Sequence, residues 1–432
     1  MLTSEQLSVN EEGHLTIGGV DTVWLAENYQ TPLYVMNEDT IRRHCKTFRQ
    51  SVQQYYGGHG LVCYASKAFC CKEVYRVMTQ EQMGVDAVSI GEMYTALSAG
   101  FNTEHICLHG NNKTKEELQF ALEHGIGRIV VDNLTELSVL NQMATEMKKT
   151  PRILLRIKPG IDAHTHDFIR TGQIDSKFGF ALETGEALEA VQCALTAKSL
   201  RLAGLHCHIG SQIFDVSPFV LAAEVMMDFR AEIRRRFSVE LEELNLGGGF
   251  GISYTHEDRP VPLEEYMKAV SQALKKKADE HQMSVPFVLL EPGRSIVATA
   301  GLTLYRIGAR KEIPGIRTYL SLDGGMTDNP RYALYQAKYE AVVANKASLL
   351  RDEQVTLAGK CCESGDLLGE NMMLQKADAG DLIAVLATGA YNYSMASHYN
   401  RIANPAVVMV ADGKARVIVK RETLEDLIRN DQ

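Results

Sequence analysis

Short apolar runs alternate with amphipathic segments between residues 61 and 290. Eight runs of four to six residues are rich in Val, Ile and Leu, which is typical of strands covered on both faces. They are Leu61–Ala65, Val85–Ser89, His105–His109, Arg128–Val131, Arg152–Ile157, Leu202–His206, Glu243–Leu246 and Phe287–Leu290. Segments of helical spacing lie between them: Lys72–Gln82, Gly91–Ala99, Thr114–His124, Leu134–Lys149, Glu183–Lys198, Pro218–Phe237 and Leu263–Glu280. This repetition predicts an α/β protein with a parallel (β/α)8 barrel of the TIM type.

An open, doubly wound sheet is the alternative arrangement of the same elements. We favour the barrel because polar or glycine-rich motifs follow nearly every predicted strand. In a barrel all these strand ends meet at one rim, whereas in an open sheet ligands are confined to the switch point of the strand order.

The pattern changes from about Thr299 onward. Helical segments become few and alternating runs appear, namely Leu302–Gly308, Thr318–Leu322, Val355–Ala358, Leu382–Leu386 and Ala406–Val410. We therefore expect a second, β-rich domain. Residues 1–30 contain short β-like pieces and no long helix, and on pattern alone they fit either domain.

Composition narrows the class of protein. The 432 residues carry a net charge of −9 without a basic stripe, which argues against a nucleic-acid partner. No apolar run approaches the roughly 18 residues of a membrane span, and the polar N-terminus predicts no secretory signal. Nine cysteines without a C-x-x-C pair indicate a reduced, cytoplasmic protein.

Lys67 follows the first predicted strand, within Tyr64–Ala68. We expect its apolar neighbours to bury it partly, which would lower its pKa and make a neutral amine available as a nucleophile. A solvated loop lysine is the alternative interpretation.

Two glycine-containing loops follow the seventh and eighth strands, Gly247–Gly251 and Glu291–Ser295. In (β/α)8 barrels these loops often bind phosphate, since glycine lets backbone amides approach an anion closely. A tight turn is the alternative for the first loop. Glu291 ends an apolar strand, so its buried charge requires a partner. A protonated ring nitrogen or Arg294 could supply one.

Two histidines, His206 and His208, end the sixth strand. They are candidates for a metal-ligand pair, with His109 and Asp86 as further ligands. In the other interpretation one histidine stacks on a flat ligand and Ser211 contacts a phosphate. An amine, a phosphate loop, a stacking ring and a buried acid together describe a site for pyridoxal 5′-phosphate.

Six motifs occur in an order that resembles the barrel-type pyridoxal-phosphate decarboxylases, whose members act on ornithine, arginine or diaminopimelate. They are YASKA, HCHIGSQ, GGGFG, EPGR, CESGD and GAY, which begin at residues 64, 206, 247, 291, 362 and 389. Asp162–His166 and Ser176–Gly179 are further cues. The resemblance implies a barrel over residues 31–298, a β-sandwich or β-barrel domain from residues 1–30 and 299–432, and a homodimer with shared active sites.

The same resemblance assigns roles to individual residues. Lys67 would bind the cofactor aldehyde covalently, His208 would stack on its ring and Glu291 would pair with the ring nitrogen. The remaining cofactor-binding residues would be Asp86, Ser211, Gly248, Gly249, Gly293, Arg294 and Tyr391. The substrate would contact Arg294, Arg331, Tyr335, Glu363 and Tyr391, and Cys362 of the partner subunit would donate a proton.

The distal end of the substrate distinguishes the members of this family. Diaminopimelate keeps a carboxylate and an ammonium at its far end, which suit the paired Arg294 and Arg331 and the acid Glu363. Ornithine has no distal carboxylate for the arginines. Decarboxylation of meso-2,6-diaminopimelate to L-lysine is therefore the expected reaction. A sibling decarboxylase, a metal-dependent barrel hydrolase and a non-catalytic homologue are the alternatives, and the roles of His109 and Arg170 stay open.

Overall fold

The computed structural model describes residues 6–161 and 176–432. Its chain divides into two compact units. The barrel unit consists of His44–Ile252 and Arg259–Gly293, and the β-rich unit of Met1–Arg43, Ser253–Asp258 and Arg294–Gln432. We expected the barrel domain to span residues 31–298, but strand β4 (Leu33–Asn37) pairs with strands of the β-rich unit. The barrel unit accordingly begins at residue 44.

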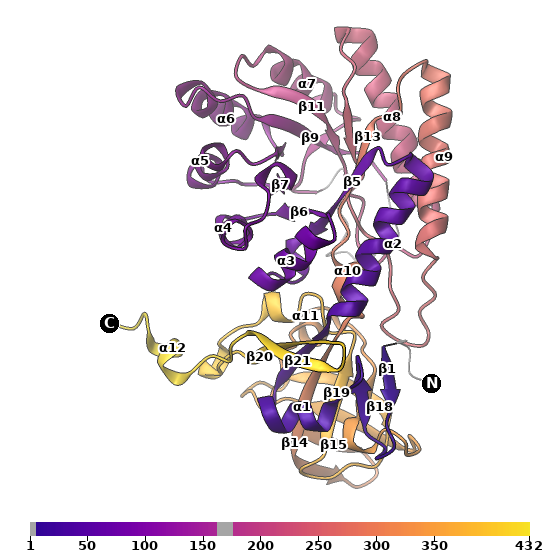
Figure 1. Ribbon diagram of the computed structural model, residues 1–432, viewed down its shortest axis with the longest axis vertical. Helices are drawn as coiled ribbons and strands as arrows, with labels where there is room; N and C mark the ends of the chain where they lie inside the picture. The colour runs from indigo at the N-terminus through magenta and orange to yellow at the C-terminus, as the bar shows by residue number, and fades with distance from the viewer. Residues whose placement is uncertain (1–5, 162–175) are drawn as a thin grey trace. The chain divides into compact units, whose positions relative to one another are not determined.

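Eight parallel strands close the barrel in the order β9, β11, β12, β13, β5, β6, β7, β8 and back to β9 (Figure 1). Their bounds are β5 (Gly60–Ala65), β6 (Gly84–Ala87), β7 (Ile106–Leu108), β8 (Arg128–Val131), β9 (Arg152–Lys158), β11 (Arg201–His206), β12 (Glu243–Asn245) and β13 (Phe287–Leu290). Each coincides with a predicted run, so the (β/α)8 barrel is confirmed. A short strand β10 (Phe180–Ala181) pairs with β9.

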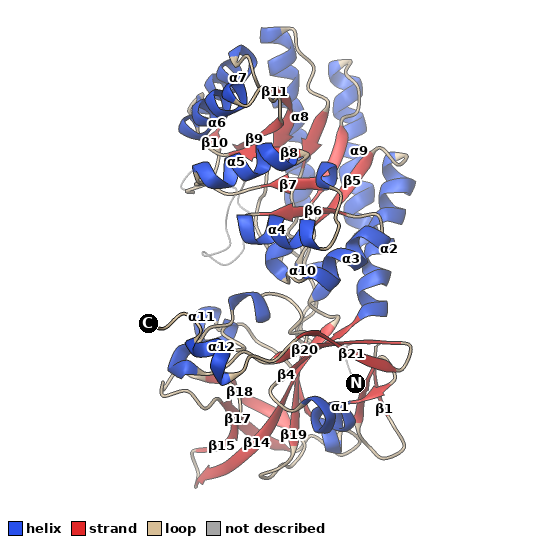
Figure 2. Cartoon of the chain, turned by 60° about the vertical axis from the view of Figure 1, so that its left-hand side comes forward, coloured by secondary structure: helices blue, strands red, loops and turns tan. Residues whose placement is uncertain are grey.

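Helices surround these strands (Figure 2). They are α2 (Glu38–Tyr56), α3 (Lys72–Gln80), α4 (Ile90–Ser98), α5 (Lys115–His124), α6 (Leu134–Glu146), α7 (Glu186–Thr196), α8 (Ser217–Phe237) and α9 (Leu263–His281). Thr114 and Glu117 form a capping box at the start of α5. Helix α2 was not predicted, because its buried apolar residues are single positions separated by mostly polar and charged side chains. They are Ile41, Cys45, Phe48, Val52 and Tyr56.

The β-rich unit is built around one mixed sheet. Its strands are β4, β14 (Gly301–Ile313), β15 (Arg317–Leu322), β16 (Ala341–Val343), β17 (Glu353–Ala358), β18 (Leu367–Leu374), β19 (Leu382–Leu386), β20 (Ala406–Ala411) and β21 (Lys414–Val419). The long strand β14 pairs with β4 and β19 through its first half and with β15 through its second. This confirms a β-rich second domain that includes N-terminal residues.

Smaller elements complete this unit. A three-stranded sheet contains β1 (Leu7–Val9), β2 (Leu15–Ile17) and β3 (Val20–Asp21), and the helices are α1 (Thr22–Tyr29), α10 (Arg294–Val297), α11 (Arg331–Tyr335) and α12 (Leu424–Ile428). No helix within the described ranges is long and apolar enough to cross a membrane. The predicted motif Asp162–His166 and Arg170 lie outside the described residues.

Candidate active site

Lys67 lies on a short turn, η1 (Ser66–Ala68), directly after β5. Its side chain is exposed, so the partial burial that we expected is wrong. The turn buries Ser66 and Ala68 and leaves Lys67 on its open side. Burial and then the charge of Lys67 lower the pKa of His208, and the same charge counteracts the effect of burial on the pKa of Asp86. The amine therefore lies close to both side chains.

The carboxylate of Glu291, directly after β13, is buried among side chains from neighbouring strand ends. His109 Nε2 lies 2.9 Å from Oε1, and His206 Nε2 lies 3.3 Å from Oε2. Asn245 donates a hydrogen bond of 2.5 Å to Oε1. The buried acid predicted at this strand end is thus present and held by three side chains.

The side chains of this cluster differ in their protonation state at neutral pH. Burial lowers the pKa of His109, but Asp86 and Glu291 raise it to about 10, so His109 is an imidazolium at neutral pH. Burial outweighs Glu291 at His206 and lowers its pKa to about 4, so His206 is neutral. Burial would raise the pKa of Glu291, but His109 and His206 hold it well below its usual range. Glu291 therefore stays ionised.

Asp86, on β6, approaches the same ring nitrogen of His109 as Glu291 does, with Oδ1 3.3 Å from Nε2. Burial raises the pKa of Asp86 to about 6, although the charge of His109 opposes this. Oδ1 has no hydrogen-bond partner in the described part of the chain. The cluster thus keeps an unsatisfied acceptor close to Lys67.

His208 and the glycine loop after β12 are in direct contact. The Gly248 amide donates a hydrogen bond of 3.3 Å to His208 Nδ1. Burial and the charges of Lys67 and Arg156 lower the pKa of His208 well below its usual value, so its ring is neutral. A Cβ at Gly248 would lie 2.1 Å from the Glu291 carbonyl oxygen, and Gly249 has a φ of +110°. Both positions therefore require glycine.

Gln212 joins the loops that follow β11 and β12. Its side-chain amide donates to the Ile252 carbonyl at 2.7 Å and accepts from the Ile252 amide at 3.2 Å. The Ile213 amide also bonds the Gly249 carbonyl at 3.0 Å. These contacts fix the backbone next to Ser211, which is half-buried, and hold the loop after β11 against the glycine loop after β12.

Sequence reasoning assigned no role to Asn245 or Arg156. Asn245 is fully buried and also accepts from the Gly247 amide at 2.9 Å, so it orients both Glu291 and the glycine loop. Arg156 lies on β9 with its guanidinium 4.1 Å from the centre of the Phe178 ring. The available signals were an amide two residues before a glycine run and an arginine inside an apolar strand.

The β-rich unit contains the predicted substrate-binding arginines. Arg294 and Arg331 are 7 % and 8 % exposed, and both guanidiniums lie over the rings of Tyr254 and Tyr391 at 4.8 to 5.7 Å. Arg331 has no carboxylate partner among residues 6–161 and 176–432. A buried charge without a partner is costly. This arrangement brings together two predicted residues and is suited to a bound anion.

Of the two predicted tyrosines, Tyr391 lies against both arginines in space and Tyr335 shares a helix with Arg331. Tyr391, half-buried, has a φ of +69°, a strained conformation for a residue with a side chain. Its ring lies beneath both guanidiniums. Tyr335 ends α11, the helix that Arg331 begins, and is half-buried.

The predicted proton donor lies on the loop after β17. Cys362 and Glu363 are both exposed, and the Cys362 amide donates to Asn400 Oδ1 at 2.7 Å. Asp366 is buried instead of lying on a solvated turn, and it accepts from the amides of Met326 at 2.6 Å and Cys361 at 2.7 Å. Asp366 thus anchors the loop that presents Cys362 and Glu363.

The barrel residues fit pyridoxal 5′-phosphate. Glu291, ionised although buried, suits a protonated ring nitrogen, and neutral His208 suits stacking on a flat ring. The amides of Gly249 and Gly293 donate no hydrogen bond within the described ranges and suit a phosphate. His206 Nδ1 and Asp86 Oδ1 are buried polar atoms that lack partners within the described residues.

A metal ion fits less well. The ligand atoms of His109, His206 and Glu291 lie within 4.8 Å of one another, and His208 is not part of this group. His109, whose pKa is raised to about 10, would first have to lose its proton, because an imidazolium has no lone pair to offer. The pair of ligands considered from the sequence, His206 and His208, does not form such a cluster among the described residues.

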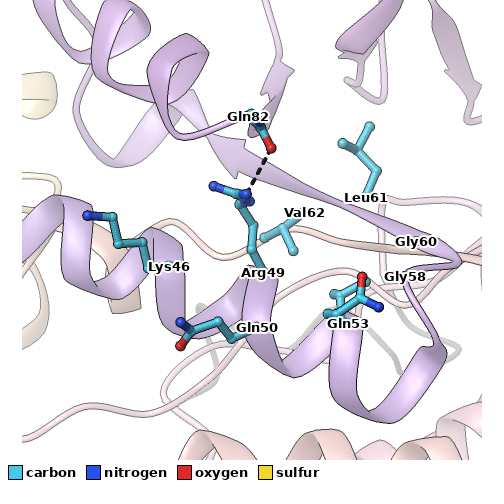
Figure 3. A pocket seen from close by; sticks show the side chains of 10 residues that line it. Lys46, Arg49, Gln50, Gln53, Gly58, Gly60, Leu61, Val62 and Gln82 are labelled. Carbon is cyan, nitrogen blue, oxygen red and sulfur yellow. Dashed lines mark hydrogen bonds between the residues drawn. The ribbon is translucent and has the colours of Figure 1, made fainter.

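An open cavity of about 560 Å³ lies at the amino-terminal end of β5, opposite the end that leads to Lys67 (Figure 3). Lys46, Arg49 and Gln53 of α2 line it, and Arg49 donates a hydrogen bond of 2.8 Å to Gln82. None of the predicted site residues lines this cavity.

Comparison with known proteins defines the class of protein first. The model of the family described as "Pyridoxal-dependent decarboxylase, pyridoxal binding domain" matches residues 38–298. The chain therefore belongs to the pyridoxal-dependent decarboxylases, which decides against a metal-dependent hydrolase.

Particular relatives narrow this class. The chain is 52% identical to diaminopimelate decarboxylase of Bacillus methanolicus over 96% of both chains. It is 50% identical to that of Bacillus subtilis strain 168, over 98% of this chain and 96% of the relative. Among solved structures, diaminopimelate decarboxylase from M. jannaschii, in complex with L-lysine, has a TM-score of 0.94 and 35% identity, covering 100% of this chain and 99% of that one. The Helicobacter pylori enzyme, also with L-lysine, has a TM-score of 0.87 and 32% identity over 95% and 98%.

Proposed function

We propose that this protein decarboxylates meso-2,6-diaminopimelate to L-lysine and carbon dioxide, using pyridoxal 5′-phosphate. The observation that carries the choice of substrate is Arg331, a buried guanidinium without a carboxylate partner in the described residues. With Arg294 over the same two tyrosine rings, it supplies a site for the carboxylate that diaminopimelate keeps.

The resemblance to the family names the residues that would hold the cofactor. Lys67 would bind its aldehyde, and Glu291, His208, Asp86 and Ser211 would contact the ring and phosphate, with Gly248, Gly249, Gly293, Arg294 and Tyr391. When bound, pyridoxal 5′-phosphate supplies a ring that accepts the electron pair left on the substrate Cα as carbon dioxide departs. Glu291, ionised at neutral pH, would favour a proton on the ring nitrogen of the bound cofactor.

The protein's own groups contribute orientation and a proton. Arg294, Arg331 and Tyr335 fix the distal carboxylate and Glu363 receives the distal ammonium, which sets the angle of the scissile bond. Cys362 Sγ delivers the proton to Cα. Cys362 is exposed in the single chain, which agrees with a homodimer in which Cys362 of the partner subunit completes each site.

The experiment measures carbon dioxide release by the purified, cofactor-loaded protein from diaminopimelate, L-ornithine and L-arginine. We expect kcat/KM for diaminopimelate to exceed that for L-ornithine by at least about 100-fold, because L-ornithine leaves buried cations unpaired. A preference for L-ornithine or L-arginine would make the protein a sibling decarboxylase.

The shared site is tested by mixing two inactive variants, Lys67→Ala and Cys362→Ala. If the subunits exchange freely, about half of the dimers are mixed and each has one intact site, so we expect about a quarter of the parent activity. Mixtures that stay inactive although the subunits have exchanged would place Cys362 in the same subunit's site or outside it.

A further inference from the structure

Two tyrosines that no motif identified hold the arginine pair of the β-rich unit. Arg294 Nη1 donates a hydrogen bond of 2.5 Å to the Tyr254 hydroxyl, and Arg331 Nη1 donates one of 2.5 Å to the Tyr339 hydroxyl. The two rings meet edge to face with centres 5.3 Å apart. Tyr254 and Tyr339 are 8 % and 5 % exposed, so these hydrogen bonds are shielded from water.

The hydroxyl oxygens act as acceptors, which leaves their protons available. Tyr339 Oη accepts from Arg331 and from Asn392 Nδ2 at 3.2 Å, and these two hydrogen bonds use both lone pairs. Tyr254 Oη accepts from Arg294. Within the described residues no acceptor takes the proton of either hydroxyl.

The buried cluster of these two arginines and two tyrosines is rich in hydrogen-bond donors. The guanidinium groups of Arg294 and Arg331 and the two phenolic hydroxyls lie together, and Arg331 has no carboxylate partner in the described ranges. Burial raises the pKa of Tyr339, so its phenol keeps its proton at neutral pH. A carboxylate, with two oxygens and about four lone-pair directions, is the ligand that such a set of donors accommodates.

We propose that Tyr254 and Tyr339 are substrate-positioning residues that hold Arg294 and Arg331 and direct their own hydroxyl protons at the distal carboxylate. The proposal rests on the proposed function and extends it, because it makes the two phenols part of the selection for a substrate with a second carboxylate. An amino acid without that group leaves these donors unpaired, which is costly in a buried site.

The test compares two ligands that differ only in the relevant carboxylate. L-Lysine carries it and cadaverine does not, and each is measured as a competitive inhibitor of diaminopimelate decarboxylation. The variants are Tyr339→Phe and Tyr254→Phe in the cofactor-loaded protein. Tyr56→Phe is the matched control, because it removes a buried hydroxyl that has no hydrogen-bond partner among the described residues and lies on α2 in the barrel unit.

We expect Tyr339→Phe to raise the KM for diaminopimelate and the inhibition constant of L-lysine about tenfold, with kcat changed less than about threefold. Inhibition by cadaverine should stay within about twofold of the parent value, and Tyr254→Phe should act in the same direction. Tyr56→Phe should change none of these constants.

If the two tyrosines had only a structural role, their substitution would raise the inhibition constants of L-lysine and cadaverine by the same factor. That result would overturn the inference. If cadaverine does not inhibit the parent, the kcat and KM values decide: a loss of kcat at unchanged KM overturns it. A parent that releases no carbon dioxide from diaminopimelate refutes the proposed function itself, whereas an active parent whose tyrosine variants bind L-lysine normally refutes only this inference.

Discussion

The barrel buries charges at both ends of its strands, and the two groups differ in how completely they are satisfied. At the amino-terminal end, Arg128 of β8 and Glu243 of β12 form two hydrogen bonds of 2.7 and 2.8 Å. At the carboxyl-terminal end, Glu291, His109 and Asp86 share contacts of 2.9 and 3.3 Å. Asp86 Oδ1 there keeps no hydrogen-bond partner in the described part of the chain.

This difference separates a structural ion pair from a binding site. The Arg128–Glu243 pair is bidentate, so donor and acceptor geometry match without help from a ligand. An unsatisfied buried polar atom costs about 1–3 kcal/mol, and such a cost is tolerated where a ligand later supplies the partner. A buried charge by itself therefore does not identify the binding site. A buried charge next to a polar atom that lacks a hydrogen-bond partner does.

The largest effect is expected from Lys67→Ala at the carboxyl-terminal end. The variant should lose decarboxylase activity by more than about 1,000-fold, because the nucleophilic amine is removed. It should also lose the visible absorbance band of the bound cofactor. Because Lys67 is exposed, the free energy of unfolding of the cofactor-free protein should change by less than about 0.5 kcal/mol.

Lys46→Ala is the matched control for this variant. Lys46 is also exposed, but it lines the cavity at the amino-terminal end of β5. Its removal should leave both the absorbance and the activity at the parent level. An unchanged visible band in Lys67→Ala would show that another amine binds the cofactor.

Glu291→Gln is expected to have the next largest effect. The amide is neutral and cannot hold a proton on the ring nitrogen, so kcat should fall by about 100-fold or more. The matched change, Glu243→Gln, removes the negative charge of the buried carboxylate at the amino-terminal end. It should lower the free energy of unfolding and leave kcat nearly unchanged. Steady-state kinetics and urea unfolding of both variants measure the contrast, and equal kinetic losses would remove the distinction between the two ends.

Arg128→Met should affect stability alone. Removing Arg128 leaves the buried Glu243 with the partly exposed Arg152, 3.8 Å away, as its remaining cation, and breaking a buried pair in this way costs up to about 3–5 kcal/mol. The double variant with Glu243→Met should recover most of this loss, since replacing both partners by apolar groups is often neutral. Urea unfolding measures the free energies, and an altered KM for diaminopimelate would contradict a purely structural role.

Much of the barrel could be predicted because its strands are continuous apolar runs with local boundaries. Helix α2 could not, because its buried stripe consists of isolated apolar residues that only the strands it covers make significant. Lys67 and Glu291 could be placed from their positions after strands. The exposure of Lys67 could not, because it depends on the direction of a three-residue turn.

Partners that are distant in sequence were also beyond prediction. Asn245 precedes a glycine run, but its hydrogen bond to Glu291 spans 46 residues. Tyr254 lies 40 residues before Arg294 and reaches it only because residues 253–258 fold with the β-rich unit. The sequence therefore identified the charged groups of the site apart from Arg156, whereas the neutral side chains that orient them emerged from the fold.

The smallest expected effect is a pH dependence of stability that distinguishes the carboxyl-terminal cluster from the amino-terminal ion pair. The pKa of His109 is raised from 6.5 to about 10 in the folded chain, so its contribution to stability is fully present below pH 6.5 and is lost as the pH rises toward 10. His206, with a pKa of about 4, is neutral above pH 7.5 in both folded and unfolded chains, and Asp86, at about 6, is ionised in both. Between pH 7.5 and 9.5 the carboxyl-terminal cluster therefore changes stability mainly through His109.

We expect the difference in Tm between the cofactor-free parent and His109→Asn to shrink by about 2 to 4 °C from pH 7.5 to 9.5. The difference between the parent and Arg128→Met should stay constant over this range, because the arginine does not lose its proton there. Thermal unfolding of the three proteins in matched buffers measures both differences. A His109→Asn difference that is independent of pH would mean that His109 is neutral in the folded chain, and Glu291 would then lack the charge that keeps it ionised.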